Sequence, residues 1–349
     1  MKILAKSIYL ILIGLIFFSC AGNKTSTQIK TSLSLLSEEI KSELREASKS
    51  IVAINSIVKY EIQTFNYLQV NGQFVPDASS PVRYKLVSND GNAGIMVEKE
   101  DKTLSGGGLV IDVDHETSRF AILTSNHLVD PRDTTNVYYL DEDGIPTDVL
   151  FARYIVKDVV TTVRMGGNWR VEAKIIATDP INDLALITLQ TQNSLWREFP
   201  NQIGSDLDLS WGDWVFLFGF PKGIKQMTGG WVSKAPYRNT LAVDAVVRFG
   251  YSGGPVFTIS KDKVKLTFVG LIKSVPRSTM DYIAPDGSLP MGYRLTFEDM
   301  DKLFVKKEVM VDYGSAYFVA PKAIKDFLNR NVTVIESAGI YLHSKYYGK

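Results

Sequence analysis

One serine stands between glycines in the stretch Phe249-Gly250-Tyr251-Ser252-Gly253-Gly254-Pro255. Glycine removes side chains beside the hydroxyl and allows backbone angles that turn N–H groups toward a common space. β-branched runs lie on both sides, at 241–247 and at 256–259. The stretch therefore predicts a tight turn between two strands, with Ser252 exposed as a candidate nucleophile.

Short β-branched and aromatic runs continue outward from this turn, from residue 51 to residue 275, with Gly, Asp and Asn between them. This pattern favours antiparallel barrels or a sandwich, and a doubly wound α/β fold is disfavoured because helical segments do not alternate with the strands. Apolar residues at three- and four-residue steps predict one amphipathic helix over 33–49.

Two further segments carry residues that could act with the serine. His127 follows an apolar strand in Leu123-Thr-Ser-Asn-His127, and Asp183 opens the apolar run Asp183-Leu-Ala-Leu-Ile187. A serine hydroxyl becomes a good nucleophile when an imidazole accepts its proton, and a buried carboxylate can orient that imidazole. The backbone N–H groups of Gly250 and Ser252 could stabilise the oxyanion that develops.

Each residue alone has a purely structural explanation. A histidine at a strand end often packs, an aspartate before a strand often forms a turn, and Ser-Gly-Gly-Pro can be a simple loop. Together, however, His127, Asp183 and Ser252 follow one another in the chain order of chymotrypsin. We therefore predict a catalytic triad.

The N-terminus has the pattern of an export signal. Lys2 and Lys6 precede an apolar run of about 11 residues, shorter than the roughly 20 that a membrane-spanning helix needs. A signal peptide is predicted over 1–19. Cys20 stands where bacterial lipoproteins carry their lipid, which predicts a lipidated tether over 20–32 and a place in the bacterial cell envelope, periplasm-facing or at the surface. The alternative is a plain signal peptide with an incidental cysteine.

Composition restricts the remaining chemistry. The chain of 349 residues carries 39 Lys+Arg against 38 Asp+Glu, so its formal charge of +1 disfavours a nucleic-acid partner. Three histidines and one cysteine exclude a Cys/His zinc cluster and a disulfide within the chain. Neither a metal-ligand motif nor a phosphate-binding glycine loop is present, so we expect no metal and no cofactor.

The three segments resemble the trypsin-like serine peptidases, and specifically their bacterial high-temperature-requirement (HtrA/Deg) branch. Further matches are Gly106-Gly107-Gly108 before the histidine segment, Gly-Asp213 and Gly219-Phe-Pro221 in the second half, and the closing Gly314-Ser-Ala-Tyr-Phe-Val-Ala-Pro321. The resemblance covers about residues 50–328. It implies a mainly β, chymotrypsin-like double six-stranded antiparallel β-barrel, with the N-terminal helix and a short C-terminal helix, as a protease domain over 33–330.

The resemblance also implies a function. An exported, lipid-anchored serine endopeptidase would cleave unfolded or misfolded proteins through an acyl-enzyme, with protein or peptide substrates and with assembly into a homo-oligomer. Only 21 residues follow Leu328, so no PDZ domain is expected, and 331–349 is interpreted as a C-terminal tail. By analogy the primary specificity pocket involves Val246, Leu271, Ile272 and Lys273, and uncharged Val246 predicts a preference for small or medium aliphatic side chains.

Two features depart from the family pattern. Tyr251 replaces the usual Asn or Asp before the nucleophile, so an ion pair to an acid at this position cannot form, and Phe249 replaces a proline. Residues 277–313 form an insertion that is either a lid or a surface excursion.

Two other functions are compatible with these residues. A catalytically weak, protease-like binding or chaperone module would keep the triad without a formed oxyanion hole. An esterase is suggested by Gly250-Tyr-Ser252-Gly-Gly254, which matches the G-x-S-x-G elbow, but that motif requires a helix after the serine and a histidine downstream of it.

Overall fold

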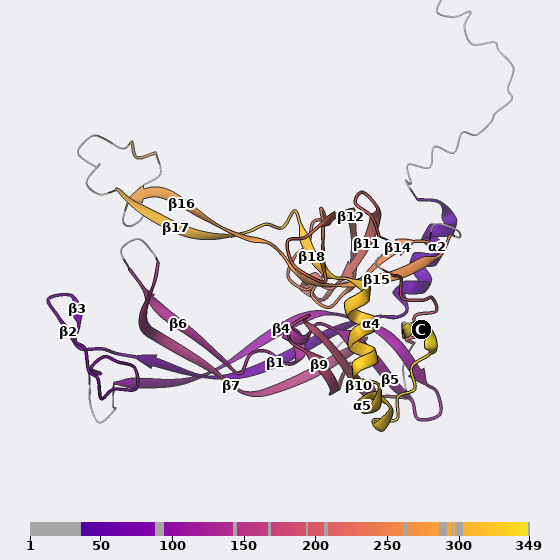
Figure 1. Ribbon diagram of the computed structural model, residues 1–349, viewed down its shortest axis with the longest axis horizontal. Helices are drawn as coiled ribbons and strands as arrows, with labels where there is room; N and C mark the ends of the chain where they lie inside the picture. Colours follow the sequence, from indigo (N-terminus) through magenta and orange to yellow (C-terminus); the bar gives the residue numbers. More distant parts are fainter. Residues whose placement is uncertain are drawn as a thin grey trace, which may run out of the picture. The chain divides into compact units, whose positions relative to one another are not determined.

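An eight-stranded sheet and a closed six-stranded barrel carry most of the chain (Figure 1). The computed structural model describes residues 36–87, 94–141, 145–166, 169–192, 195–205, 209–260, 264–285, 292–294, 296 and 303–347. The predicted signal peptide, Cys20 and the tether lie outside these residues and stay predictions. Within the described ranges, no helix combines the length and the apolar character needed to cross a bilayer.

The N-terminal sheet has the strand order β6–β7–β1–β4–β5–β10–β9, with β8 paired to β7. Strands β5 and β10 are buried almost throughout, which explains why their sequences are apolar without alternation. The bounds are β1 Ile51–Phe65, β4 Ile95–Asp114, β5 Arg119–Thr124, β6 Thr134–Leu140, β7 Pro146–Gly166, β8 Trp169–Glu172, β9 Lys174–Asp179 and β10 Leu184–Gln190.

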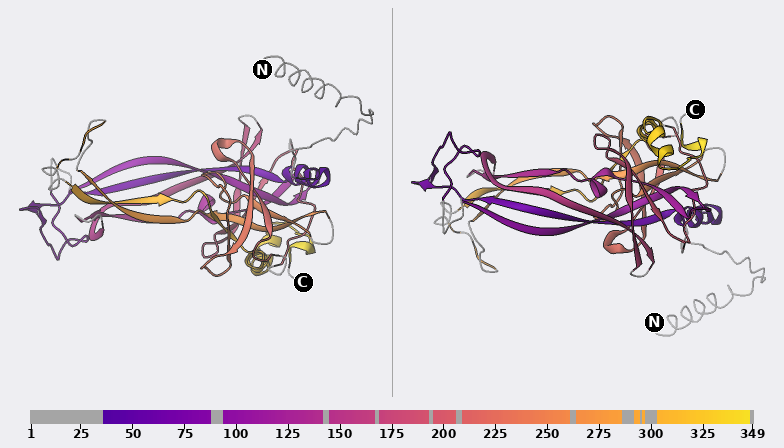
Figure 2. Two further views of the ribbon diagram at one scale, coloured as in Figure 1. Left: turned by 90° about the horizontal axis from the view of Figure 1, so that it is seen from above. Right: turned by 90° about the horizontal axis from the view of Figure 1, so that it is seen from below.

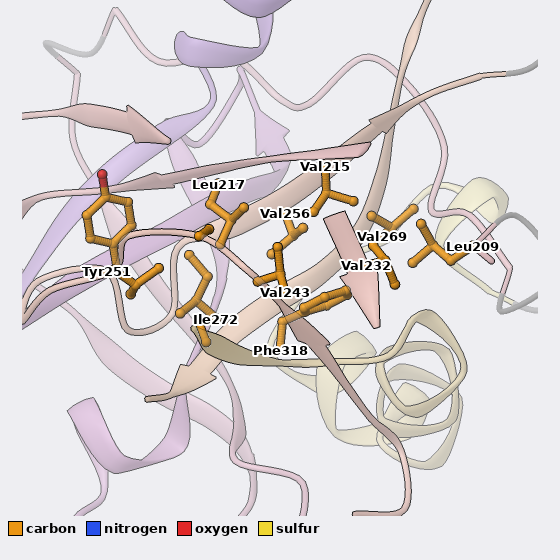
Figure 3. Packing of buried hydrophobic residues seen from close by; sticks show 13 residues of the cluster. Leu209, Val215, Leu217, Val232, Val243, Tyr251, Val256, Val269, Ile272 and Phe318 are labelled. Carbon is orange, nitrogen blue, oxygen red and sulfur yellow. The ribbon is translucent and has the colours of Figure 1, made fainter. Parts of the chain in front are cut away.

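The C-terminal barrel closes through the strand order β11–β12–β13–β18–β15–β14. Its strands are β11 Trp214–Gly219, β12 Gln226–Lys234, β13 Thr240–Val243, β14 Pro255–Ile259, β15 Leu266–Ser274 and β18 Ala316–Val319. Buried side chains fill it, and we call this set the barrel core (Figure 3): Leu209, Val215, Leu217, Val232, Val243, Ala245, Val247, Tyr251, Val256, Val269, Ile272, Ala316 and Phe318.

The predicted mainly β fold class is confirmed, with one closed barrel and an N-terminal half-barrel. The three strands β1, β4 and β7 have 15, 20 and 21 residues, far more than the five or six of an average strand. In β4, residues 106–111 are buried whereas residues 96–103 are exposed. The inner part of each long strand thus belongs to the half-barrel, and the outer part extends past it.

A second, smaller group of apolar side chains lies at the far end of these strands, where Phe65 pairs with Ile95. We call it the outer cluster. Its buried members are Phe65, Tyr67, Val149 and Leu150, and Phe74, Val82, Tyr84, Leu86, Ile95 and Tyr139 pack against them. The short hairpin of β2 (Gln69–Val70) and β3 (Gln73–Phe74) belongs to the same region.

Helices occupy the two ends of the described chain. Helix α2 (Glu38–Ser48) lies within the predicted range 33–49, and α4 (Pro321–Arg330) is the expected C-terminal helix. The segment interpreted as a tail contains α5 (Val332–Ser337) and the short helix η4 (Ser344–Tyr346), and its Ile335 and Tyr346 are fully buried. Helix α4 contacts β15 and α5 contacts β9, and Figure 2 shows these yellow helices against the body of the molecule.

The inserted segment forms a two-stranded hairpin of β16 (Arg277–Pro285) and β17 (Leu303–Val311). It leaves the barrel directly after β15 and returns just before β18. The hairpin pairs only with itself among the described strands, so it adds no strand to the barrel.

Candidate active site

His127 lies at the end of buried strand β5, in the four-residue helix α3 (Asn126–Val129). The backbone before it is fixed by two buried hydroxyls: Thr124 Oγ1 donates to Gly107 O at 2.8 Å, and Ser125 Oγ donates to Ile272 O at 3.1 Å. The second of these bonds ties the histidine segment to barrel strand β15. The His127 side chain is 42% exposed, so one edge of its ring is open to a substrate.

Asp183 holds the imidazole. Its Oδ2 lies 2.8 Å from His127 Nδ1, and its Oδ1 accepts the backbone N–H of His127 at 2.9 Å. An ionised carboxylate can only accept, so in the neutral imidazole Nδ1 carries the proton and Nε2 keeps its lone pair. The Asp183 side chain is 10% exposed, and this burial strengthens the contact by excluding water.

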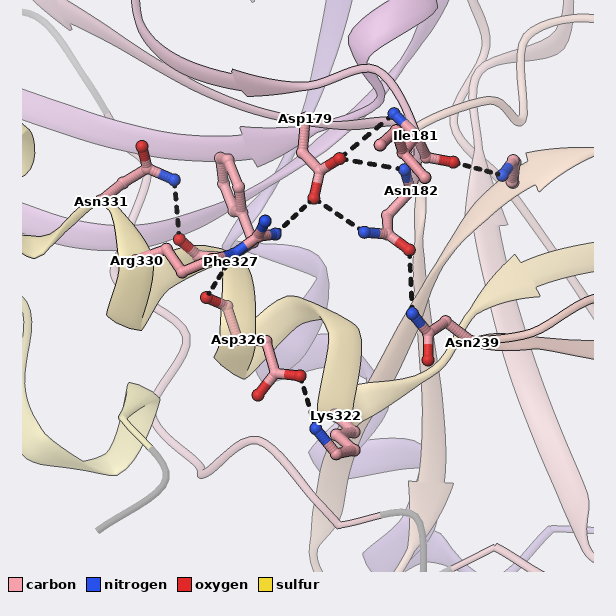
Figure 4. Close-up of polar contacts among 10 residues, drawn as sticks. Asp179, Ile181, Asn182, Asn239, Lys322, Asp326, Phe327, Arg330 and Asn331 are labelled. Carbon is pink, nitrogen blue, oxygen red and sulfur yellow. Dashed lines mark hydrogen bonds and ion pairs between the residues drawn. The ribbon is translucent and has the colours of Figure 1, made fainter.

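The turn before β10 gives Asp183 its position, with a left-handed backbone of φ +61°. Asp179 organises this turn: its Oδ1 accepts the N–H groups of Ile181 and Asn182 at 3.1 Å, and Asn182 Nδ2 donates to its Oδ2 at 2.7 Å (Figure 4). Arg330 of α4 donates to the same Oδ2 at 2.6 Å. Burial raises the pKa of Asp179, but the Asn182 hydrogen bonds and the Arg330 guanidinium outweigh this and hold the pKa below its usual value.

Ser252 lies on a turn between two glycines with positive φ, Gly250 at +104° and Gly253 at +70°. This backbone conformation is costly for residues with a Cβ. The turn is held from both sides, because Gly107 of β4 donates to Ser252 O and Gly253 donates to Ile272 O, each at 2.8 Å. The predicted nucleophile turn therefore rests on the N-terminal sheet and on the barrel together.

The glycines of β4 make this contact possible. A Cβ added to Gly106 would collide with the Ser252 carbonyl oxygen, and one added to Gly107 would lie 3.0 Å from the Cα atom of Gly254. Only a strand without side chains can pass so close to the serine turn.

Two backbone N–H groups of the turn remain open. In the described part of the chain, neither Gly250 N nor Ser252 N donates to a protein acceptor. These are the groups predicted to receive the oxyanion. Within the same residues, no hydrogen bond joins Ser252 Oγ to the His127 ring. Asp183 and His127 are therefore in contact, whereas Ser252 Oγ makes no hydrogen bond to the imidazole in this part of the structure.

Tyr251 explains how the turn is ordered without an acid at this position. Its ring is 3% exposed and belongs to the barrel core (Figure 3). A Cβ on Gly219 would lie 2.5 Å from this ring, so the glycine provides the space that the ring occupies. Burial raises the pKa of the Tyr251 hydroxyl. Apolar packing thus anchors the residue before Ser252.

The predicted specificity residues lie in different environments. Val246 is 56% exposed, whereas Leu271 and Ile272 are almost fully buried, the latter in the barrel core. Lys273 Nζ donates to Ile181 O at 3.4 Å, beside the catalytic turn. Of the four, Val246 and Lys273 present side chains that could contact a substrate, while Ile272 acts through its carbonyl.

After Ser252 the chain enters strand β14. The G-x-S-x-G elbow of esterases requires a helix there, so the structure does not support the esterase alternative.

The comparisons with known proteins agree with this geometry. The model of the trypsin-like peptidase domain matches residues 106–265, a range that contains His127, Asp183 and Ser252. Residues 106–265 of this chain are therefore similar to trypsin-like peptidase domains. A probable periplasmic DegP-like serine endoprotease of Brucella suis is 28% identical to this peptidase domain over 179 residues, which is 45% of this chain and 34% of the relative.

A second relative with the same description, from Rhizobium meliloti, is 28% identical over 217 residues, or 55% of this chain and 42% of its own length. The chain thus spans 34% and 42% of the length of these two relatives. A solved HtrA-type protease with a decapeptide has a TM-score of 0.46 and 14% identity, over 86% of this chain and 68% of that one.

Sequence reasoning missed the residues that support Asp183. The Asp179-Pro-Ile-Asn182 run is a recognisable Asx-turn pattern, so part of the support had a local signal. Arg330 had no such local signal. It is 151 residues from Asp179 in the sequence, and there it is only one of several basic residues on an amphipathic helix.

Proposed function

We propose that the protein is an exported serine endopeptidase that uses His127, Asp183 and Ser252 as its triad. The observation that carries this proposal is the double contact of Asp183 with the ring and the backbone of His127, at 2.8 and 2.9 Å. It sets the imidazole in the tautomer whose Nε2 can accept a proton.

The proposed reaction has two halves. Ser252 Oγ attacks the peptide carbonyl carbon while its proton passes to His127 Nε2, and the N–H groups of Gly250 and Ser252 stabilise the oxyanion. The C–N bond then breaks, and the leaving amine takes the proton from His127. A water repeats the sequence on the acyl-enzyme, so that the carboxylic acid leaves and Ser252 regains its proton.

The test combines a fluorophosphonate probe with cleavage of an unfolded protein. Ser252→Ala should abolish labelling, and His127→Ala should lower turnover by about six orders of magnitude because the base is lost. His115→Ala is the matched control, since His115 is exposed in the turn after β4 and lies outside the triad. Equal labelling in the parent protein and in Ser252→Ala would contradict the proposal.

A second candidate function is a binding or chaperone module with weak catalysis. It is favoured by the hydroxyl of Ser252, which makes no hydrogen bond to His127 within the described residues. Binding of an unfolded protein without labelling of Ser252 would favour this alternative. Labelling with a protease-like rate would remove it.

Localisation is also proposed, from residues outside the described part of the chain. The lysines and apolar run of 1–19 support export, and the periplasmic relatives agree with it. Lipidation at Cys20 predicts incorporation of labelled palmitate that is lost in Cys20→Ser. Unfolded or misfolded proteins remain the proposed substrates, and assembly into a homo-oligomer stays a prediction of the resemblance.

A further inference from the structure

A cavity of about 530 Å³ opens beside the turn that carries Asp183. Ile181 of that turn forms one wall, and the connection between β12 and β13 forms another through Tyr237 and Arg238. The end of β15 and the start of β16 complete it, with Lys273 and Arg277. Three separate segments of the fold therefore converge on a space next to the catalytic machinery.

The charge of this cavity is one-sided. Arg238, Lys273 and Arg277 line it, and among the lining residues that the structure describes there is no aspartate or glutamate. Among the described residues no carboxylate forms an ion pair with any of these three cations. Some other basic side chains of the described surface are paired with carboxylates, as Lys59 is with Asp158 at 2.8 Å. Unneutralised like charges around one hollow create a positive potential that attracts an anion.

The remaining walls suit a small acidic side chain. Tyr237 and Tyr317 meet edge to face, with ring centroids 5.5 Å apart, and both line the cavity. Their rings can pack against the methylene groups of a glutamate while their hydroxyls and the neighbouring cations bind its carboxylate.

The position relative to Ser252 sets which part of a substrate could reach the cavity. Ile272 O accepts the N–H of Gly253, directly after the serine, and Lys273 and Ser274 follow in the same strand and line the cavity. Extended chain rises about 3.3 Å per residue, so a substrate side chain two to four residues from the cleaved bond would lie within reach.

We propose that this cavity selects peptide substrates with a glutamate or aspartate two to four residues from the cleaved bond. The inference rests on the proposed peptidase function and adds a second element of specificity to it. Val246 carries no charge, so the side chain at the cleaved bond is selected by its size. The cationic cavity selects a second side chain, two to four residues away, by its charge.

The experiment uses quenched fluorescent peptides of one length, with an aliphatic residue at the cleaved bond. Alanine, glutamate or lysine is placed in turn at each of the four positions on either side. At one or more positions glutamate should raise kcat/KM about two- to fivefold over alanine, and lysine should lower it, because a charge pair at a partly exposed site is worth about this much. The glutamate preference should shrink as salt is added.

Two variants assign the preference to the cavity. The double change Arg238→Gln and Arg277→Gln should bring the glutamate-to-alanine ratio toward one. Arg170→Gln is the matched control, because Arg170 is an exposed arginine of β8 that does not line the cavity, and it should leave the ratio unchanged. A preference that is absent, or that survives the double change, would overturn the proposal.

A binding measurement separates this proposal from the peptidase function. Fluorescence anisotropy of the same peptides on Ser252→Ala reports the cavity without catalysis. Tighter binding of the glutamate peptide that is lost in the double variant supports the cavity even if no cleavage occurs anywhere. Equal binding of the alanine and glutamate peptides refutes it even if Ser252 is an active nucleophile.

Discussion

The barrel core and the outer cluster are both apolar, but the chain supports them differently. The barrel core lies inside a closed ring in which every strand is paired on both sides. The outer cluster is carried at the far end of three long strands, and its buried members in the described part of the chain are Phe65, Tyr67, Val149 and Leu150. A closed sheet has no free edge, whereas the outer region depends on local packing alone.

We expect this difference to separate residues that determine the stability of the whole protein from residues that affect only the far end of the long strands. Two of the residues that position Ser252, Tyr251 and Ile272, belong to the barrel core. The outer cluster contains no residue of the candidate site. We therefore expect damage to the barrel core to unfold the protein and silence the serine together, and damage to the outer cluster to remain local.

The largest effect is expected from Phe318→Ala. Phe318 is fully buried in the barrel core, and its ring packs over Gly270, where a Cβ would lie 2.4 Å away. Loss of the ring leaves a cavity and should lower the free energy of unfolding by about 3–5 kcal/mol. Chemical denaturation measures this, and fluorophosphonate labelling should fall with the folded fraction. A loss below about 1 kcal/mol would mean that the barrel core is not the main source of stability.

A smaller and local effect is expected from Tyr67→Ala. Tyr67 contacts the rings of Phe65, Phe74, Tyr84 and Tyr139, and its hydroxyl donates to Leu150 O at 2.7 Å. Amide exchange should report a loss of about 2–3 kcal/mol of protection confined to the outer cluster. Tyr67→Phe is the control that removes only the hydroxyl, at about 1 kcal/mol. Loss of Ser252 labelling in Tyr67→Ala would break the comparison.

The smallest effect on stability is expected from a change at Asp112, a partly buried carboxyl of β4 in the N-terminal sheet. The barrel core contains no carboxyl. Burial raises the pKa of Asp112 to about 6, and the nearby charges of Glu198 and Asp114 add to this. The folded state therefore binds the proton more tightly than the unfolded chain. The resulting stability is present below pH 4 and is lost as the pH rises through about 6.

Asp112→Asn should accordingly stabilise the protein at pH 7 by about 1 kcal/mol, a figure reduced for the solvent that screens this half-buried group. Asp114→Asn is a control for which a change of stability in the opposite direction is expected. Hydrogen bonds from Thr117 hold the pKa of Asp114 below its usual value, so this change should destabilise the protein at pH 7. Parallel pH–stability curves for the parent protein and Asp112→Asn would contradict the assignment.

The sequence indicated three candidate triad residues because each of them has a local signal. His127 follows a buried strand, Asp183 begins one, and Ser252 stands between glycines whose positive φ the structure confirms. Their order along the chain completed the inference. The roles of these residues in catalysis remain proposals that the labelling experiment tests.

The long strands were not predictable from the same rules. Residues 98–102 of β4 are Glu-Lys-Glu-Asp-Lys, a charged run that has low strand propensity and is typical of a loop. They form a strand because β1 supplies their hydrogen-bond partners from one side. In the described ladders this stretch has no strand on its other side, and charged side chains are common on such edges.

The Arg330–Asp179 contact escaped prediction for a different reason. Periodicity shows which face of α4 is buried, but it does not say which distant turn an exposed arginine at the end of the helix will reach. Tertiary placement alone brings these two groups to 2.6 Å.

The bare backbone of β4 at Gly106 and Gly107 has a consequence for how such a protein can change. Because the serine turn meets this strand through backbone atoms, their contact does not depend on any side chain at Gly106 or Gly107. Side chains join the two halves elsewhere, as Ser125 Oγ does with Ile272 O and Asn239 does with Asn182. We therefore expect the strip at Gly106 and Gly107 to tolerate changes on either side of it as long as the strip itself stays free of side chains.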